Sequence, residues 1–122
     1  KSIAHRLLIG AALSKEKCTI SGVDYSEDIL ASIDCLVSLG ARVITENDVV
    51  TIEPSDFMRV ENPILECRES GSTLRFFIPL ALCLGKKVTL CGSERLLSRP
   101  LDVYEQLCKE NGFLFEKLYV IR

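Results

Sequence analysis

The chain has 122 residues, 48% hydrophobic and 26% charged, with a net charge of -2 and an isoelectric point of about 5.5. This composition is typical of a globular chain the size of one domain, and it disfavours non-specific nucleic-acid binding, which usually needs a basic domain. Because no apolar run reaches about 18 residues and the first residues lack the layout of a signal peptide, we expect no membrane partner.

In its first half the chain alternates between helix and strand patterns. Apolar side chains recur at helical spacing in two stretches, and Ser26 and Gly40 suit the start and the end of the second stretch. Two later β-rich runs are joined across Asn47, which favours a hairpin. In chain order, the predicted elements are a helix over 3–13, a strand over 17–21, a helix over 26–39 and strands over 42–45 and 49–53.

The second half repeats this order after an additional leading strand. Its first helix is apolar on nearly all sides, which predicts burial, and Pro79 within that helix predicts a kink. Pro100 suits the first turn of the next helix. In chain order, the predicted elements are a strand over 64–68, a helix over 72–84, a strand over 87–91, a helix that begins at Pro100 and a hairpin over 113–121.

The two halves resemble each other as an internal repeat. Ser2 aligns with Ser72, and Gly22 aligns with Gly92. We therefore predict two copies of one unit within a single domain, 1–54 without its leading strand and 62–122 with it. Because the helices are more apolar than the strands, the helices are expected inside and the sheets outside, the reverse of a doubly wound α/β fold.

Cysteine and histidine usage argues against a metal centre. The chain has six cysteines, none in a C-x-x-C pair, and one histidine, so a zinc site is disfavoured and no cofactor is expected. Most of the cysteines stand in apolar runs, as Cys83 does, which favours reduced thiols used as small core residues. Reduced thiols predict a cytoplasmic protein.

Residues suited to anion binding gather at the predicted helix starts. A helix start offers unpaired N–H groups and a partial positive charge, glycine allows close approach, and arginine matches phosphate or carboxylate geometry. Cations there are unfavourable without a counter-ion, so the clusters predict a phosphate-and-carboxylate site. The residues are Lys1, Ser2 and Arg6 at the first helix, Gly71, Ser72 and Arg75 at the third, and Arg95 and Arg99 beside Pro100.

Several residues near these helix starts also have a simpler interpretation. Ser2, Ser72 and Ser98 could be plain helix caps, and Arg75 could hold a loop carbonyl. His5, the single imidazole, could be a general base, although a histidine beside an arginine is more often a hydrogen-bonding residue. No P-loop, Rossmann glycine pattern, nucleophile motif or carboxylate pair stands out, so no catalytic residue is assigned.

Three ordered segments resemble motifs of the EPSP synthase (3-phosphoshikimate 1-carboxyvinyltransferase) family. Segment 1–8 is similar to K-[ST]-x-[ST]-[NH]-R-x-L, 70–76 to [AS]-G-T-x-x-R, and 92–100 to G-[DE]-x-R-[ML]-x-x-R-P. The resemblance spans the whole chain, which would be a minority of the family's full length. It implies the enolpyruvyl transferase fold, an α/β (α+β) inverse barrel of repeated β-α-β-α-β-β units with helices inside and sheets outside.

The resemblance also implies a reaction. In that family the enolpyruvyl group of phosphoenolpyruvate is transferred to the 5-hydroxyl of shikimate 3-phosphate, and phosphate is released without a metal, on the way to chorismate and aromatic amino acids. Ser72 and Arg75 would support the loop at Gly71. The implied substrate contacts are Lys1, Ser2 and Arg6 for shikimate 3-phosphate, and Lys1, Gly71 and Arg99 for phosphoenolpyruvate.

Departures from the family pattern include Glu69 and Ser72. Glu69 stands where Asn is usual, which puts a negative charge near the anion site, and Ser72 replaces Thr. The family's acid–base residues lie further along the chain than these 122 residues, so the chain alone is expected to be inactive without the C-terminal domain. The full-length protein is expected to be a monomer.

Related families offer alternatives. UDP-N-acetylglucosamine carboxyvinyltransferases share the fold and the donor, but their first motif has Lys-Asn and their reactive loop carries a Cys, Asp or similar insertion, whereas this chain has Lys1-Ser2 and Gly71-Ser72. RNA 3′-terminal phosphate cyclases share related units but lack the Lys-Ser…Arg segment. An alternative from a different class is a non-catalytic anion-binding module.

Overall fold

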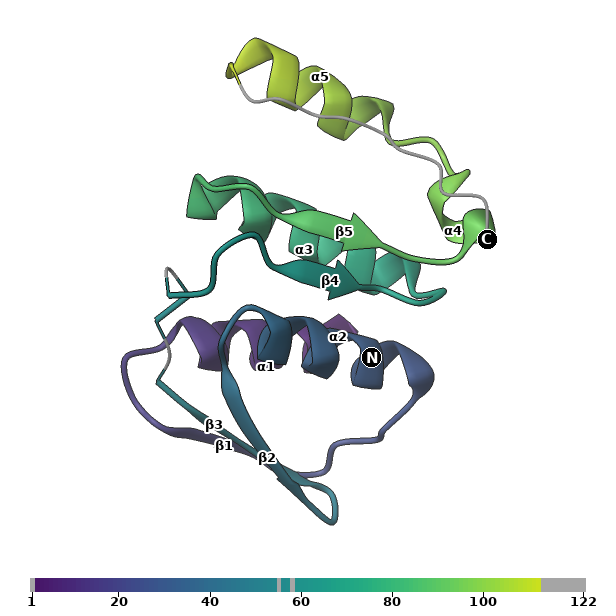
Figure 1. Cartoon of the computed structure of the whole chain (residues 1–122). Helices are drawn as coiled ribbons and strands as arrows, with labels where there is room; N and C mark the ends of the chain where they lie inside the picture. Colours follow the sequence, from purple (N-terminus) through teal and green to yellow (C-terminus); the bar gives the residue numbers. More distant parts are fainter. Residues whose placement is uncertain (1, 55, 58, 113–122) are drawn as a thin grey trace.

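A computed structural model describes residues 2–54, 56–57 and 59–112. The helices and strands predicted up to residue 91 are confirmed in type and order, with boundaries that differ by at most two residues. In chain order, the elements are α1 (Ser2–Leu13), β1 (Cys18–Ile20), α2 (Glu27–Ser38), β2 (Arg42–Glu46), β3 (Val49–Glu53), β4 (Ile64–Glu66), α3 (Gly71–Leu84), β5 (Thr89–Cys91), α4 (Glu94–Leu97) and α5 (Asp102–Glu110) (Figure 1).

The first sheet has three antiparallel strands in the order β1-β3-β2. The predicted hairpin is present, with Glu46 opposite Val49 across a turn in which Asn47 has a φ of 53°. Asparagine tolerates this left-handed conformation better than most residues. Side chains alternate along the central strand β3, where Val50 and Ile52 are fully buried, so one face of the sheet packs on the helices.

The second sheet is a parallel pair, β4 and β5, joined through α3. Its register places Ile64 opposite Thr89 and Glu66 opposite Cys91, so both strands end at the same edge. Within β4 only the central Leu65 is buried, which leaves one face of the pair outside. Because parallel strands end together, the turn into α3 and the turn into α4 leave the sheet side by side.

Helices α1 and α2 lie between the three-stranded sheet and the layer formed by β4, β5 and α3 (Figure 1). Fully buried side chains from each part meet in one core, among them Leu8 of α1, Leu36 of α2 and Phe77 of α3. The prediction of helices inside and sheets outside is therefore confirmed. No helix in the described part of the chain is both long enough and apolar enough to span a membrane.

The predicted helix start at Pro100 is wrong. Ser93 instead caps the short helix α4, which contains Arg95 and ends with Ser98 as its C-cap. Pro100 disfavours a helical conformation for the residue before it, so Arg99 and Pro100 lie in the connection to α5, which starts at Asp102. The hairpin predicted over 113–121 lies outside the described residues. The kink at Pro79 and the division into units 1–54 and 62–122 stay predictions.

The six cysteines, all within the described residues, are free thiols. The prediction of core thiols is confirmed for Cys35, Cys67 and Cys108, which are buried, and wrong for Cys83, which is exposed. A side-chain hydrogen bond with Cys67 raises the pKa of the Cys35 thiol, and burial raises it further. Both effects keep Cys35 in its neutral form, as suits a core residue.

Candidate anion-binding site

The site is built where the turns that follow β4 and β5 meet. The Cys67 N–H donates to the Cys91 carbonyl at 2.8 Å, and the Ser93 N–H donates to the Arg68 carbonyl at 2.8 Å. A Cβ added at Gly92 would stand 2.9 Å from the Arg68 carbonyl oxygen, closer than such atoms approach, so only glycine allows this contact. The chain segments that lead into α3 and α4 are thereby fixed against each other.

The start of α3 is capped by a serine, and the first turn that follows the cap carries no negative charge. The buried Ser70 is the N-cap, and its hydroxyl accepts the Thr73 N–H at 3.0 Å. The interpretation of Ser72 as the cap is therefore wrong, and Ser98 is a C-cap rather than an N-cap. The first turn of α3, which the structure describes in full, contains no acidic residue to balance the positive end of the helix.

Two guanidinium groups lie against this helix start. A Cβ added at Gly71 would stand 2.6 Å from Nη1 of Arg99 and 3.3 Å from Nη1 of Arg75. Nη2 of Arg75 also donates to the Ser72 hydroxyl at 3.5 Å. Positive side chains at the positive end of a helix are unfavourable, and an anion bound between them would offset this repulsion. Such an anion would meet backbone N–H groups and two arginine forks.

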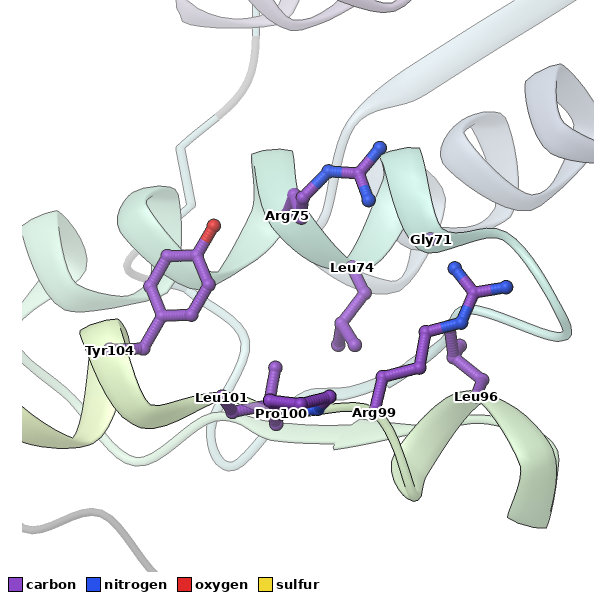
Figure 2. A pocket seen from close by; sticks show the side chains of 8 residues that line it. All are labelled: Gly71, Leu74, Arg75, Leu96, Arg99, Pro100, Leu101 and Tyr104. Atoms are coloured by element: carbon purple, nitrogen blue, oxygen red, sulfur yellow. The ribbon is translucent and has the colours of Figure 1, made fainter.

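A cavity of about 260 Å³ opens beside Gly71. Arg75 and Arg99 lie toward its Gly71 end, whereas Tyr104 lies at the opposite end (Figure 2). The cavity is thus charged at one end and apolar over much of the rest, which suits a small anion with an uncharged carbon portion. Its lining residues are Gly71, Leu74, Arg75, Leu96, Arg99, Pro100, Leu101 and Tyr104.

Tyr104 was not identified by the sequence interpretation. It lies in the first turn of α5, is half-buried, and lines the cavity from the side opposite α3. An aromatic residue one turn after Arg99-Pro100 is the feature of the sequence that could have indicated it, because Tyr has an apolar ring and a polar tip.

A second, more polar pocket of about 230 Å³ adjoins the first and shares Leu96 and Arg99 with it. Its remaining lining residues are Glu69, Ser93 and Arg95. Arg99 therefore lies between the two pockets. Glu69 lines the same pocket as Arg95 and Arg99, so its negative charge competes with an external anion for these two arginines.

Arg6 approaches α3 from another side. Its Cζ lies 5.9 Å from the centroid of the Phe76 ring, within the range of a cation–π contact. Successive helical residues are rotated by about 100°, so Phe76 and Gly71 face different directions on α3. Arg6 is not among the described residues that line either pocket. Lys1 and the side chain of Ser2 lie outside the described part of the chain.

His5 is fully buried in α1, and its Nδ1 lies 2.6 Å from the Ser32 hydroxyl. The hydrogen-bonding role that the sequence favoured over general-base catalysis is confirmed.

Within residues 2–54, 56–57 and 59–112, no group of three or more His, Cys, Asp or Glu side chains could hold a metal ion. The site that the structure assembles therefore comprises Gly71, Ser72, Arg75 and Arg99.

Comparisons with known proteins place the chain in one family. The family model of EPSP synthase (3-phosphoshikimate 1-carboxyvinyltransferase) matches residues 1–113. The 3-phosphoshikimate 1-carboxyvinyltransferase of Clostridium kluyveri is 41% identical over 116 residues, which is 95% of this chain and 27% of that protein. The protein of the same name from Clostridium perfringens is 41% identical over 111 residues, which is 90% of this chain and 26% of that protein.

The solved structure of EPSP synthase from Acinetobacter baumannii matches with a TM-score of 0.79 at 22% identity. The match covers 93% of this chain and 27% of that one. It confirms the predicted fold class, α/β (α+β) units with helices inside and sheets outside. The chain spans about a quarter of the length of the relatives that it matches.

Proposed function

Because this chain belongs to the EPSP synthase family, we propose that it forms one wall of an active site that joins phosphoenolpyruvate to shikimate 3-phosphate. The observation that carries the proposal is the start of α3, where the Arg75 and Arg99 guanidinium groups flank Gly71 with no acidic residue in that first turn. The full-length protein transfers the enolpyruvyl group to the 5-hydroxyl of shikimate 3-phosphate and releases phosphate, a step of aromatic amino-acid biosynthesis.

Gly71 and Arg99 hold phosphoenolpyruvate. This substrate carries a phosphate and a carboxylate on a small unsaturated carbon unit, and the charged end of the 260 Å³ cavity suits the anionic groups. The apolar end, which includes Leu74 and Leu101, suits the uncharged carbon. Arg75 supports the turn at Gly71 through the Ser72 hydroxyl. Holding charge at the departing phosphate lowers the barrier of the transfer.

Residues at the start of α1 hold shikimate 3-phosphate. The contact with Phe76 fixes the orientation of the Arg6 guanidinium. This guanidinium binds the phosphate of shikimate 3-phosphate. Ser2 and Lys1 complete this side, and Lys1 contacts both substrates. The two substrates thus approach α3 from different sides, so their relative placement depends on how α1 and α3 are packed.

The remaining groups come from elsewhere in the full-length protein. The C-terminal domain supplies the acid–base residues and further phosphate ligands, so the 122-residue chain alone is inactive. The full-length protein acts as a monomer. Its location is the cytoplasm, which is consistent with the six free thiols because a reducing compartment preserves them.

Phosphate release by the full-length protein tests the proposal. With phosphoenolpyruvate present, release is expected only when shikimate 3-phosphate is added. Calorimetry is expected to show weaker binding of shikimate 3-phosphate by Arg6→Ala and of phosphoenolpyruvate by Arg99→Ala. Arg42→Ala is the matched control, because Arg42 lies on β2 and pairs with Glu53.

Four results would contradict the proposal. Phosphate release without an acceptor would indicate a different reaction. Transfer to UDP-N-acetylglucosamine in place of shikimate 3-phosphate would indicate the related carboxyvinyltransferase, and anion binding without turnover would indicate a binding module. Unchanged binding in both Arg6→Ala and Arg99→Ala would refute the site assignment.

A further inference from the structure

A buried row of hydrogen bonds connects the three central helices. Nδ1 of His5 on α1 lies 2.6 Å from the Ser32 hydroxyl on α2, and this hydroxyl lies 2.9 Å from the Thr73 hydroxyl on α3. The Thr73 hydroxyl donates to the Asp28 carbonyl at 3.1 Å. The side chains of His5, Ser32 and Thr73 belong to residues with 0% exposure, so water does not substitute for these contacts.

The donors in this row follow from the number of protons. A hydroxyl has one proton, and that of Thr73 goes to a carbonyl, which can only accept. The Thr73 oxygen must therefore accept from the Ser32 hydroxyl, and Ser32 must accept from Nδ1–H of His5. The row runs in one direction, from His5 through Ser32 and Thr73 to the Asp28 carbonyl, and this direction places a proton on Nδ1.

The two outermost side chains of this row, those of His5 and Thr73, adjoin residues of the proposed site. His5 immediately precedes Arg6 in the first turns of α1. Thr73 is two residues after Gly71, and its N–H is the one that the Ser70 cap accepts. The row therefore joins the helix start that holds one substrate to the helix start that holds the other, with Ser32 of α2 as the middle link.

Polar side chains are a demanding choice for these positions. Apolar contacts between helices have little directional preference, whereas buried hydroxyl and imidazole groups must keep their partners or lose free energy. A shift of α1 along α3 would lengthen the bonds of His5 and Thr73 to Ser32. The row thus favours a single register of the two helices over neighbouring ones.

We propose that His5, Ser32 and Thr73 are positioning residues that set the spacing between the two substrates. This inference rests on the proposed function, in which Arg6 and Gly71 bind different substrates. The residues touch neither substrate. They act by holding α1 and α3 in the register at which the acceptor hydroxyl meets the enolpyruvyl carbon.

Steady-state kinetics of the full-length protein distinguish positioning from binding. In Thr73→Val the hydroxyl is lost, so kcat is expected to fall about 10- to 100-fold, the range expected for reactants misplaced by about 1 Å. The KM of each substrate should change by less than about threefold, since each helix start keeps its own ligands. Thr73→Ser keeps the hydroxyl and is expected to restore kcat to within about threefold of the parent.

Two further variants separate this effect from a loss of stability. Cys35→Ala is the matched control, because Cys35 is fully buried on α2, three residues after Ser32, and its thiol contacts the Glu66 carbonyl instead of α1 or α3. It should lower the melting temperature with little change in kcat. Ser32→Ala should lower kcat as Thr73→Val does, and the double variant should be no slower than the slower single variant, because both break one row.

The inference is overturned if Ser32→Ala keeps kcat within about threefold of the parent. It is likewise overturned if Ser32→Ala lowers kcat no more than Cys35→Ala does. It is also overturned if KM rises while kcat is kept. If Thr73→Val does not fold, Ser32→Ala decides by the same criteria, with Thr73→Ser as the conservative comparison. A parent protein without shikimate 3-phosphate-dependent phosphate release would refute the proposed function instead, which keeps the two failures distinct.

Discussion

The starts of α2 and α3 share a capping geometry and differ in charge. At α2 the Ser26 hydroxyl accepts the Ile29 N–H at 3.3 Å, and at α3 the Ser70 hydroxyl accepts the Thr73 N–H at 3.0 Å. After its cap, α2 continues with Glu27 and Asp28, two acidic residues. The first turn of α3, fully described, contains no acidic residue.

This difference separates a structural helix start from a binding one. At α2 the chain supplies its own negative charge, and Glu27 pairs further with Arg68 at 2.9 Å. At α3 the chain adds positive charge, since Arg75 and Arg99 approach Gly71. A capped helix start alone therefore indicates nothing about function. The sign of the charges gathered around it does.

Among the changes at the two helix starts, removing one positive side chain at α3 should have the largest effect on substrate binding and turnover. In the full-length protein, Arg99→Ala is expected to lower kcat/KM for phosphoenolpyruvate about 100- to 1,000-fold, or about 3 to 4 kcal/mol, because a charge partner of the substrate is lost. Arg42→Ala on β2 should have no such effect. Initial-rate measurements check both, and equal values for the two variants would contradict the account.

Giving α3 the acidic first turn of α2 should have the next largest effect. Ser72→Glu supplies an internal anion, so phosphoenolpyruvate affinity should fall about tenfold or more. Thermal stability should instead rise slightly, by about 0.3 to 1 kcal/mol, because the helix end is compensated. Ser72→Gln, similar in size and uncharged, is the control. Calorimetry in which Ser72→Glu binds as tightly as Ser72→Gln would refute this expectation.

Filling the space at Gly71 should weaken binding moderately. A Cβ there would stand 2.6 Å from Nη1 of Arg99, the mobile end of a long side chain, so Gly71→Ala displaces that guanidinium while the backbone remains. We expect a three- to tenfold loss, about 1 kcal/mol, in phosphoenolpyruvate affinity. Gly10→Ala on α1 is the control, because its Cβ would meet nothing within 4 Å. Tighter or unchanged binding by Gly71→Ala would count against the site.

Substitutions in α2 should change the stability of the protein without changing its affinity for anions. The pKa of the Cys35 thiol is raised in the folded chain, so the folded state holds the thiol proton more tightly than the unfolded state does. Its stabilising effect is present below the unfolded value of about 8.5 and is lost as pH rises above it, at about 1 kcal/mol over the first pH unit. Between pH 8 and about 10, urea denaturation should show that Cys35→Ala loses less free energy of unfolding than the parent does. The same slope as the parent would contradict the prediction.

The smallest effect is expected from neutralising the exposed start of α2. Glu27→Gln removes one balancing charge and the pair with Arg68, so stability should fall by about 0.3 to 1 kcal/mol. Phosphoenolpyruvate affinity should stay unchanged. Thermal denaturation and calorimetry on the same sample check the two halves of this expectation, and a loss of affinity would show that α2 also contributes to the site.

Local chemistry allowed much of the fold to be predicted. The apolar spacing of α1 and α2, the Ser26 cap and the hairpin across Asn47 each depend on residues close in sequence, so the sequence carries them. The start of α5 was missed because Ser93 and Pro100 compete to define a helix, and only the packed structure shows that Ser93 begins a separate one.

The candidate site was predicted only in part, because its remaining features join distant residues. The sequence indicated Gly71 and Arg99 separately, but their proximity depends on the parallel pairing of β4 with β5 and on the contact between Gly92 and Arg68. The hydrogen bonds through Ser32 span 27 and 41 residues, and no local pattern of the sequence marks them.

Amide chemical shifts of the full-length protein test the central claim most directly. Titration with phosphoenolpyruvate is expected to shift the Gly71 and Ser72 amides saturably, to leave the Glu27 and Asp28 amides in place, and to lose its effect in Arg99→Ala. Shifts of equal size at both helix starts, or binding that leaves the Gly71 amide unmoved, would contradict the claim that α3 binds an external anion where α2 carries its own.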